Sequence, residues 1–257
     1  MKPIIAQHTA ARWLAVTAGA GCLLLTSCNG LFSWLYDDPP SWSEETHISG
    51  QLKLDASSWT SWKFVNLEVE ADSLITITTL PIPTDEATGP DDKTGIYSYW
   101  YDVFGQGISK NEYRSFYSTA AQTQPEAWTF AVHRNNVMTN GGAVFETTCT
   151  SISELPESSD AFSGADFASD TWNEKDVWVI QDKMVLGIIG NQGISINATL
   201  SSWLTIDIPP MPPAYTLNDH VFILRTASGK YAALQLENYK GTDGTNCCLT
   251  VNYKYPY

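Results

Sequence analysis

The chain has few of the residues on which most catalytic and metal sites depend. It contains only four histidines and five cysteines. The GxSxG, HExxH, P-loop and GxGxxG patterns of hydrolases, zinc proteases and nucleotide-binding enzymes do not occur. No CxxC pair occurs either, which removes the usual zinc knuckles and redox motifs. These absences nominate no catalytic site, so we do not expect an enzyme, and a secreted hydrolase built on dispersed carboxylates is a lower-ranked alternative.

Basic side chains are also scarce. The chain has 14 Lys and Arg against 28 Asp and Glu. Lys2 and Arg12 lie in a segment that we expect to be cleaved off, so the remaining 230 residues would carry a formal charge of −16. Such a surface repels phosphate backbones, which excludes nucleic acid as a partner.

Cysteine is too sparse for a disulfide framework. Beyond the N-terminal region only Cys149, Cys247 and Cys248 remain. Three is an odd number, so at least one thiol is free or pairs between molecules. A bridge from Cys149 to one of the adjacent pair stays open, and burial as free thiols is the commoner outcome.

The N-terminal apolar run is too short to cross a membrane. It spans residues 13–25, follows Lys2 and Arg12, and leads into Leu25-Thr26-Ser27-Cys28. A basic start, a short apolar stretch and a cysteine after small residues form the lipobox pattern of bacterial lipoproteins. We expect residues 1–27 to be a signal peptide and Cys28 to be acylated, so that the protein is tethered to a membrane surface. An ordinary signal peptide and a membrane-spanning helix are the alternatives.

The segment that begins at Cys28, residues 28–48, is expected to be a tether, because it is polar and contains prolines. A globular domain is expected over residues 49–257. The prolines and acids of the tether are Asp37, Asp38, Pro39, Pro40, Glu44 and Glu45.

The C-terminal third has the clearest secondary-structure pattern. Residues 220–226, 230–239 and 247–255 are three β-prone runs, with Ser228-Gly229 and Asp243-Gly244 between them. The last run alternates apolar and polar side chains, as a half-buried strand does. Short connections between consecutive strands favour an antiparallel meander, and we predict an all-β fold with few short helices.

The rest of the chain gives weaker signals. Residues 62–67, 72–79, 128–134 and 177–181 read as strands, 81–95 as a loop and 151–171 as mostly loop. A helix is expected over residues 108–121. Thr139-Asn140-Gly141-Gly142 is typical of a turn, so residues 143–150 are expected to return as the strand after 128–134.

Two stretches resemble the HmuY family of haem-binding lipoproteins from Bacteroidetes. The first is residues 128–134 (WTFAVHR) followed by 139–145 (TNGGAVF), and the second is residues 221–232 continuing to 250–255. Residues 57–67 look like the opening strand of the family. The resemblance implies one antiparallel, calycin-like β domain with a cleft that clamps haem between two axial ligands.

In that family the ligands are histidines or methionines, and they lie between the two matched stretches. Here residues 146–219 contain no histidine, but they contain Met184 and Met211. The setting of Met211, residues 203–213, resembles that of methionine-using members, and its four prolines stiffen the loop. The resemblance therefore implies that Met184 and Met211 are the axial ligands of haem iron; the alternative is that Met211 merely fills a gap.

Other ligand candidates are weaker. We expect His133 to be structural, His220 to be exposed, His47 to lie near the tether and Met138 to lie beside the turn. The resemblance also implies an outer-membrane location, on the cell-surface or periplasmic face, and a haem transporter of the outer membrane as partner. A binding module for glycan or protein on the same scaffold is the alternative function, because tryptophan and tyrosine are abundant. Residues 81–124 look like an insertion, which could cover the cleft.

Overall fold

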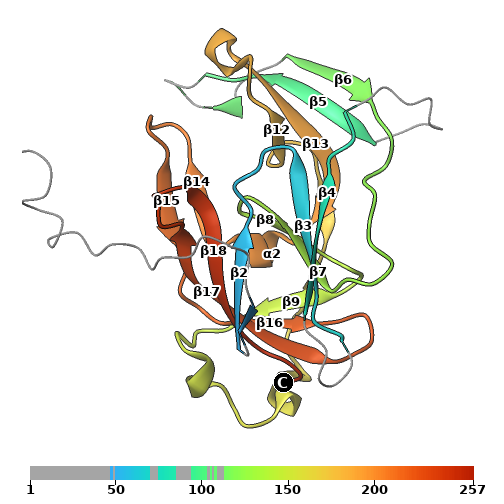
Figure 1. Ribbon diagram of the computed structural model, residues 1–257, viewed down its shortest axis with the longest axis vertical. Coiled ribbons are helices and arrows are strands. Elements are labelled where there is room, and N and C mark those ends of the chain that lie inside the picture. The colour runs from blue at the N-terminus through green and yellow to red at the C-terminus, as the bar shows by residue number, and fades with distance from the viewer. Residues whose placement is uncertain are drawn as a thin grey trace, which may run out of the picture. The chain divides into compact units, whose positions relative to one another are not determined.

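Antiparallel pairing organises all the strands of the structure. The computed structural model describes residues 47–48, 50–69, 75–84, 94–102, 105, 107–108 and 113–257 (Figure 1). The expected signal peptide, Cys28 and the tether up to residue 46 lie outside these residues. Every strand pairing that the structure describes is antiparallel, so the prediction of an antiparallel all-β fold is confirmed. Within the same residues, no helix has the length and apolar character needed to span a membrane.

The largest sheet has seven strands in the order β1-β2-β18-β17-β16-β9-β10. The predicted C-terminal meander forms its centre, where Ile223 of β16 lies opposite Ala233 and Leu236 of β17 lies opposite Val251. The bounds are β1 His47–Ile48, β2 Gln51–Asp55, β9 Ala143–Glu146, β10 Ala168–Ser169, β16 Phe222–Arg225, β17 Tyr231–Lys240 and β18 Asn246–Lys254.

Three smaller sheets complete the fold. A four-stranded sheet has the order β4-β3-β7-β8, a five-stranded sheet contains β11-β13-β5-β6 with β12 beside β13, and β14 and β15 form a hairpin. Their bounds are β3 Ser61–Asn66, β4 Thr76–Pro81, β5 Gly95–Trp100, β6 Arg114–Ser118, β7 Phe130–His133, β8 Asn136–Thr139, β11 Thr171–Asn173, β12 Trp178–Ile180, β13 Ile188–Ile196, β14 Leu204–Asp207 and β15 Ala214–Leu217.

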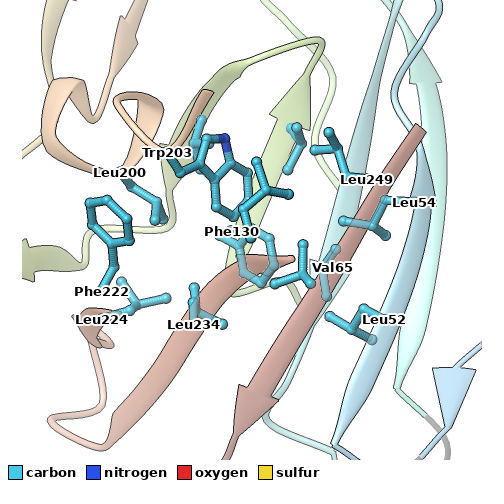
Figure 2. Close-up of a cluster of buried hydrophobic side chains, with 14 of the residues drawn as sticks. Leu52, Leu54, Val65, Phe130, Leu200, Trp203, Phe222, Leu224, Leu234 and Leu249 are labelled. Atoms are coloured by element: carbon cyan, nitrogen blue, oxygen red, sulfur yellow. The ribbon is translucent and has the colours of Figure 1, made fainter. Parts of the chain in front are cut away.

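The main core lies between the seven-stranded sheet and the β3–β7 pair. Leu52 and Leu54 alternate with half-buried residues along β2, so one face of that strand is apolar. Figure 2 shows these side chains converging with others from β7, the meander and the segment around α2 (Ala198–Ser201). The fully buried members that Figure 2 labels are Leu52, Leu54, Val65, Phe130, Leu200, Trp203, Phe222, Leu224, Leu234 and Leu249. Burial of this apolar surface is the main driving force for packing the two sheets.

The helices are few and short, as the sequence predicts. Those that lie wholly in the part of the chain that the structure describes are α2 and three 3-10 turns, η3 (Ile152–Glu154), η4 (Ser159–Phe162) and η5 (Met184–Leu186). The Asn197 side chain caps α2 by accepting a hydrogen bond from the backbone N–H of Leu200. Cys149, Cys247 and Cys248 are all free thiols.

Two sequence predictions are wrong. The helix expected over residues 108–121 is not formed, because residues 114–118 are the edge strand β6, which pairs with β5. The hairpin expected at Asn140-Gly141 is not formed either. The return of β7 occurs earlier, at Arg134 and Asn135, and produces the unpredicted strand β8. β9 then crosses to the large sheet and pairs with β16, so it is a strand but not the partner of β7.

Candidate functional site

One cavity of about 520 Å³ lies between the β14–β15 hairpin, the η5 turn and the β7–β8 turn. In Figure 1 the hairpin stands at the left of the view and β12 and β13 stand near the centre. The lining residues are Trp59, Arg134, Asn135, Asn136, Thr171, Asn173, Asp176, Trp178, Gln181, Met184, Ile196, Ala198, Ser201, Ser202, Leu204, Thr205, Ile206, Ile208, Met211, Pro213 and Tyr215. Both predicted ligands, Met184 and Met211, are among them.

Met184 lies at the start of η5, on the segment that joins β12 to β13. Its N–H donates to the carbonyl of Gln181 at 2.9 Å, and Gly187 ends the turn with φ at +76°. The half-buried Met184 side chain packs against a cluster that includes Tyr101 and Ile208. The η5 segment therefore forms a fixed arm at one side of the cavity, and Met184 is among the residues that line the cavity.

Met211 lies in the proline-rich connection of the β14–β15 hairpin, and its side chain is 48% exposed. The hairpin is anchored at its base by the fully buried Trp203, whose carbonyl accepts from the N–H of Asn218 at 2.9 Å. Farther along, Ile206 and Tyr215 lie opposite each other and pack against the main core. The two methionines thus reach one cavity from different arms.

Aromatic rings form one wall of this cavity. Trp59 stacks on Trp178 with ring centroids 6.5 Å apart and an interplanar angle of 22°. Trp178 in turn meets Tyr101 edge to face at 4.9 Å, and its indole N–H donates to the Lys175 carbonyl. A flat, apolar ligand would find large ring surfaces there.

Arg134 supplies a positive charge to the same cavity. It occupies the tight β7–β8 turn with φ at +56°, and its side chain is 9% exposed. Its guanidinium carbon lies 3.8 Å from the centroid of the Trp59 ring, and Nη1 donates to the Ser57 carbonyl at 2.9 Å. Sequence reasoning did not nominate Arg134 or Trp59 for the site, because nothing in the local pattern shows that the loop before β3 meets this turn.

The weaker candidates lie elsewhere. His133 is fully buried, and its Nε2–H donates to the Trp59 carbonyl at 3.1 Å. Met138 belongs to a second buried cluster, and His220 contacts Glu146 at 2.8 Å near the surface. None of these three lines the cavity. His47 lies in β1, of whose side chains nothing is described.

The described part of the insertion, residues 81–124, does not line the cavity. β5 instead pairs with β13, so that Trp100 lies opposite Ile188, and the N–H of Tyr101 donates to the Gly187 carbonyl at 2.6 Å. Among the described residues, no group of three His, Cys, Asp or Glu side chains forms a metal-binding cluster.

Comparison with known proteins gives a family match and several similar solved structures. The family model for the HmuY protein matches residues 58–253, whereas no curated protein has a significant match. A solved structure from Bacteroides vulgatus, described as an HmuY-like haem-binding protein, shares 26% identity with a TM-score of 0.57, over 83% of this chain and 96% of that one. A lipoprotein structure from Bacteroides fragilis shares 25% identity with a TM-score of 0.57, over 83% and 94%. The apo form of an HmuY analogue from Tannerella forsythia shares the fold at 19% identity, with a TM-score of 0.54 over 82% and 97%.

Proposed function

This chain belongs to the HmuY family, and from that premise we propose that it binds haem in the cavity between the β14–β15 hairpin and η5. The similar Bacteroides vulgatus protein is described as haem-binding. A volume of about 520 Å³ falls within the range of small-molecule and cofactor sites. The aromatic wall of Trp59 and Trp178 suits a flat macrocycle. The volume and the aromatic lining of the cavity both support haem as the ligand.

The axial ligands in this proposal are the sulfurs of Met184 and Met211. The observation that carries it is that two methionines 27 positions apart, on separate arms, line the same cavity. The Pro-rich connection around Met211 limits backbone freedom, and Gly187 closes the η5 turn after Met184. In the proposed complex each arm would hold one thioether on the haem iron.

Thioether ligands have chemical consequences for the proposed site. They are soft donors and favour ferrous iron, so the protein is expected to bind reduced haem more tightly than oxidised haem. They also carry no proton at ordinary pH, so affinity is expected to vary little in mildly acid solution, unlike that of an imidazole site.

Titration of the mature protein with haemin and with dithionite-reduced haemin tests this function. We expect the Soret band of haemin to shift and sharpen on addition of the wild type, and Met184→Leu and Met211→Leu to give a different band with weaker binding. Leucine keeps nearly the same volume and removes only the sulfur. Met138→Leu is the matched control, because Met138 is buried in another cluster, and it should bind haem as the wild type does. Absence of binding in both redox states would refute the proposal.

Delivery and anchoring are part of the same proposal. An acyl group on Cys28 and the acidic tether that follows would keep the domain near an outer-membrane transporter, to which it would pass haem. Growth with radiolabelled palmitate should label the wild type and not Cys28→Ser. Label on Cys28→Ser, or none on the wild type, would contradict the anchor.

Glycan binding is the second candidate function, and exposed aromatic side chains outside the cavity favour it. Five aromatic side chains on and around β5, β6 and β11 are 38–44% exposed: Trp100, Tyr113, Phe116, Tyr117 and Trp172. Exposed rings of this kind can stack on sugars. Glycan-array binding by a protein that ignores haem in both redox states would support this function over the first.

A further inference from the structure

We infer that Arg134 forms a carboxylate-binding subsite in the wall of this cavity, and that it binds a propionate group of the haem. The inference rests on the proposed function and deepens it, because it says which chemical feature of the ligand the protein recognises besides iron. It concerns a residue that is neither an axial ligand nor part of either methionine arm.

The position of Arg134 is the first observation. The guanidinium belongs to a side chain that is only 9% exposed, yet Arg134 lines the cavity. It is fixed from two sides, by the Trp59 ring against one face at 3.8 Å and by the Ser57 carbonyl at 2.9 Å from Nη1. Burial raises the pKa of Tyr215 on the opposite hairpin, and Arg134 lowers that pKa in part through its charge and a side-chain hydrogen bond. The cation is therefore preorganised.

The second observation is charge. Arginine stays protonated in proteins, so this nearly buried side chain carries a full positive charge. Among the described residues, no carboxylate forms an ion pair with Arg134. Asp176 is the single acid of the cavity lining, and its carboxylate accepts from the Asn173 amide at 2.6 Å. Burial of a charge without a counterion is unfavourable, and an anionic ligand would relieve it.

The third observation is donor geometry. A guanidinium has five N–H donors, and the Ser57 carbonyl accepts from one of its nitrogens. Stacking on Trp59 uses the face of the group, and its edge serves the Ser57 carbonyl and the Tyr215 hydroxyl, which leaves three of its five N–H donors for a ligand. A carboxylate is the anion that matches this planar edge with two parallel hydrogen bonds. The ligand class is thus a flat, apolar molecule that bears a carboxylate, and the propionates of haem meet that description.

Haemin and its dimethyl ester separate this subsite from the rest of the site, because the ester keeps the iron and the macrocycle but has no ionised propionate. Both would be titrated into wild-type protein and Arg134→Gln in the same detergent buffer. We expect the wild type to bind haemin roughly 10- to 100-fold more tightly than the ester. We expect Arg134→Gln to lose this preference while binding the ester about as well as the wild type does. Arg134→Lys keeps the charge without the planar guanidinium, so its preference for haemin over the ester should lie between those of the wild type and Arg134→Gln.

The outcomes are distinguishable. Equal affinity of the wild type for haemin and the ester would overturn the inference and leave haem binding intact, and this comparison needs no variant to fold. An equal loss for both ligands in Arg134→Gln, or an undiminished preference for haemin, would also overturn it, because the residue would then be structural or irrelevant. Failure of the wild type to bind either ligand would overturn the proposed function and this inference with it.

Discussion

Two adjacent polar residues at the end of β7, His133 and Arg134, are almost completely removed from water and have different environments. Arg134 reaches the cavity with its charge intact. His133 points into the protein, where its ring lies 5.4 Å from that of Trp62 and its Nδ1 has no hydrogen-bond partner among the described residues. Burial lowers the pKa of His133 to about 4, and the hydrogen bond to the Trp59 carbonyl offsets this only in part. The imidazole is therefore neutral in the folded protein at ordinary pH.

This buried imidazole predicts a loss of stability in mild acid. Unfolded histidine takes up a proton near pH 6.5, whereas folded His133 does so only near pH 4. The unfolded state therefore binds more protons in this window, and stability falls as pH falls through it. Between pH 7 and pH 5 the free energy of unfolding of the wild type should drop by about 2 kcal/mol more than that of His133→Gln.

Urea unfolding at the two pH values measures the difference. Gly164→Ala is the control, since it removes no titratable group and a Cβ there would meet no atom within 4 Å, and it should keep the wild-type pH dependence. The same pH dependence in His133→Gln as in the wild type would show that His133 is not the group responsible.

At the residue scale, the sequence predicts Met184 and Met211 as ligands and does not point to Arg134. The family resemblance directs attention to residues 146–219, and because that region has no histidine, methionine is the soft ligand type that it offers. Arg134 belongs to the motif of residues 128–134, but its proposed role depends on Trp59, which is 75 positions earlier in the chain. Only the folded arrangement of the β7–β8 turn against the loop before β3 brings them together.

At the scale of elements, local patterns predict the meander well and the β7–β8–β9 corner poorly. The meander strands alternate and are joined by short glycine-containing turns, so sequence neighbours are also spatial neighbours. At the corner, the true hairpin turn uses Arg134 with a positive φ, which is rare for a residue other than glycine. Gly141 has a positive φ as predicted for a turn, but the chain leaves the sheet there instead of reversing within it.

The crossing from β8 to β9 explains why a second glycine follows Gly141. A Cβ atom on Gly142 would lie 2.8 Å from the carbonyl oxygen of Arg225, a backbone atom held by the β9–β16 pairing. We expect Gly142→Ala to lower the free energy of unfolding by about 1–3 kcal/mol, because the two strands must separate locally.

Gly164→Ala is the matched control for this substitution. A Cβ at Gly164 would meet no atom within 4 Å, so the change should stay within about 0.5 kcal/mol. Thermal or urea unfolding compares the two variants. Equal stability of Gly142→Ala and Gly164→Ala would contradict the close approach of β9 and β16.

At the scale of the whole molecule, strand β5, which lies in the expected insertion, supports one arm of the proposed site. β5 pairs with β13 beside Gly187, and Tyr101 packs in the same cluster as Met184. The sequence shows the insertion only as an irregular stretch, because its function comes from a pairing between segments about 90 positions apart. The described part of the insertion therefore stabilises the proposed site and does not fill it.

Binding of haem between the two arms should stabilise the whole domain, and more so in the reduced state. At a ligand concentration of about 100 times Kd, linkage adds about 2.7 kcal/mol, which corresponds to roughly 5–10 °C in Tm for a domain of this size. Tm measured by circular dichroism should rise further with dithionite-reduced haemin than with haemin. The Met184→Leu/Met211→Leu double variant should lose this redox difference, and an equal shift in both redox states for the wild type would contradict thioether ligation.

X-ray absorption at the iron K-edge of the reduced haem complex tests axial ligation by Met184 and Met211 most directly. The wild type should show two sulfur scatterers at roughly 2.3 Å from iron, a length borrowed from metal–sulfur bonds in zinc sites. Each single leucine variant should show one sulfur scatterer. A spectrum that requires only nitrogen and oxygen ligands in the wild type, or one that does not change in either variant, would contradict the account.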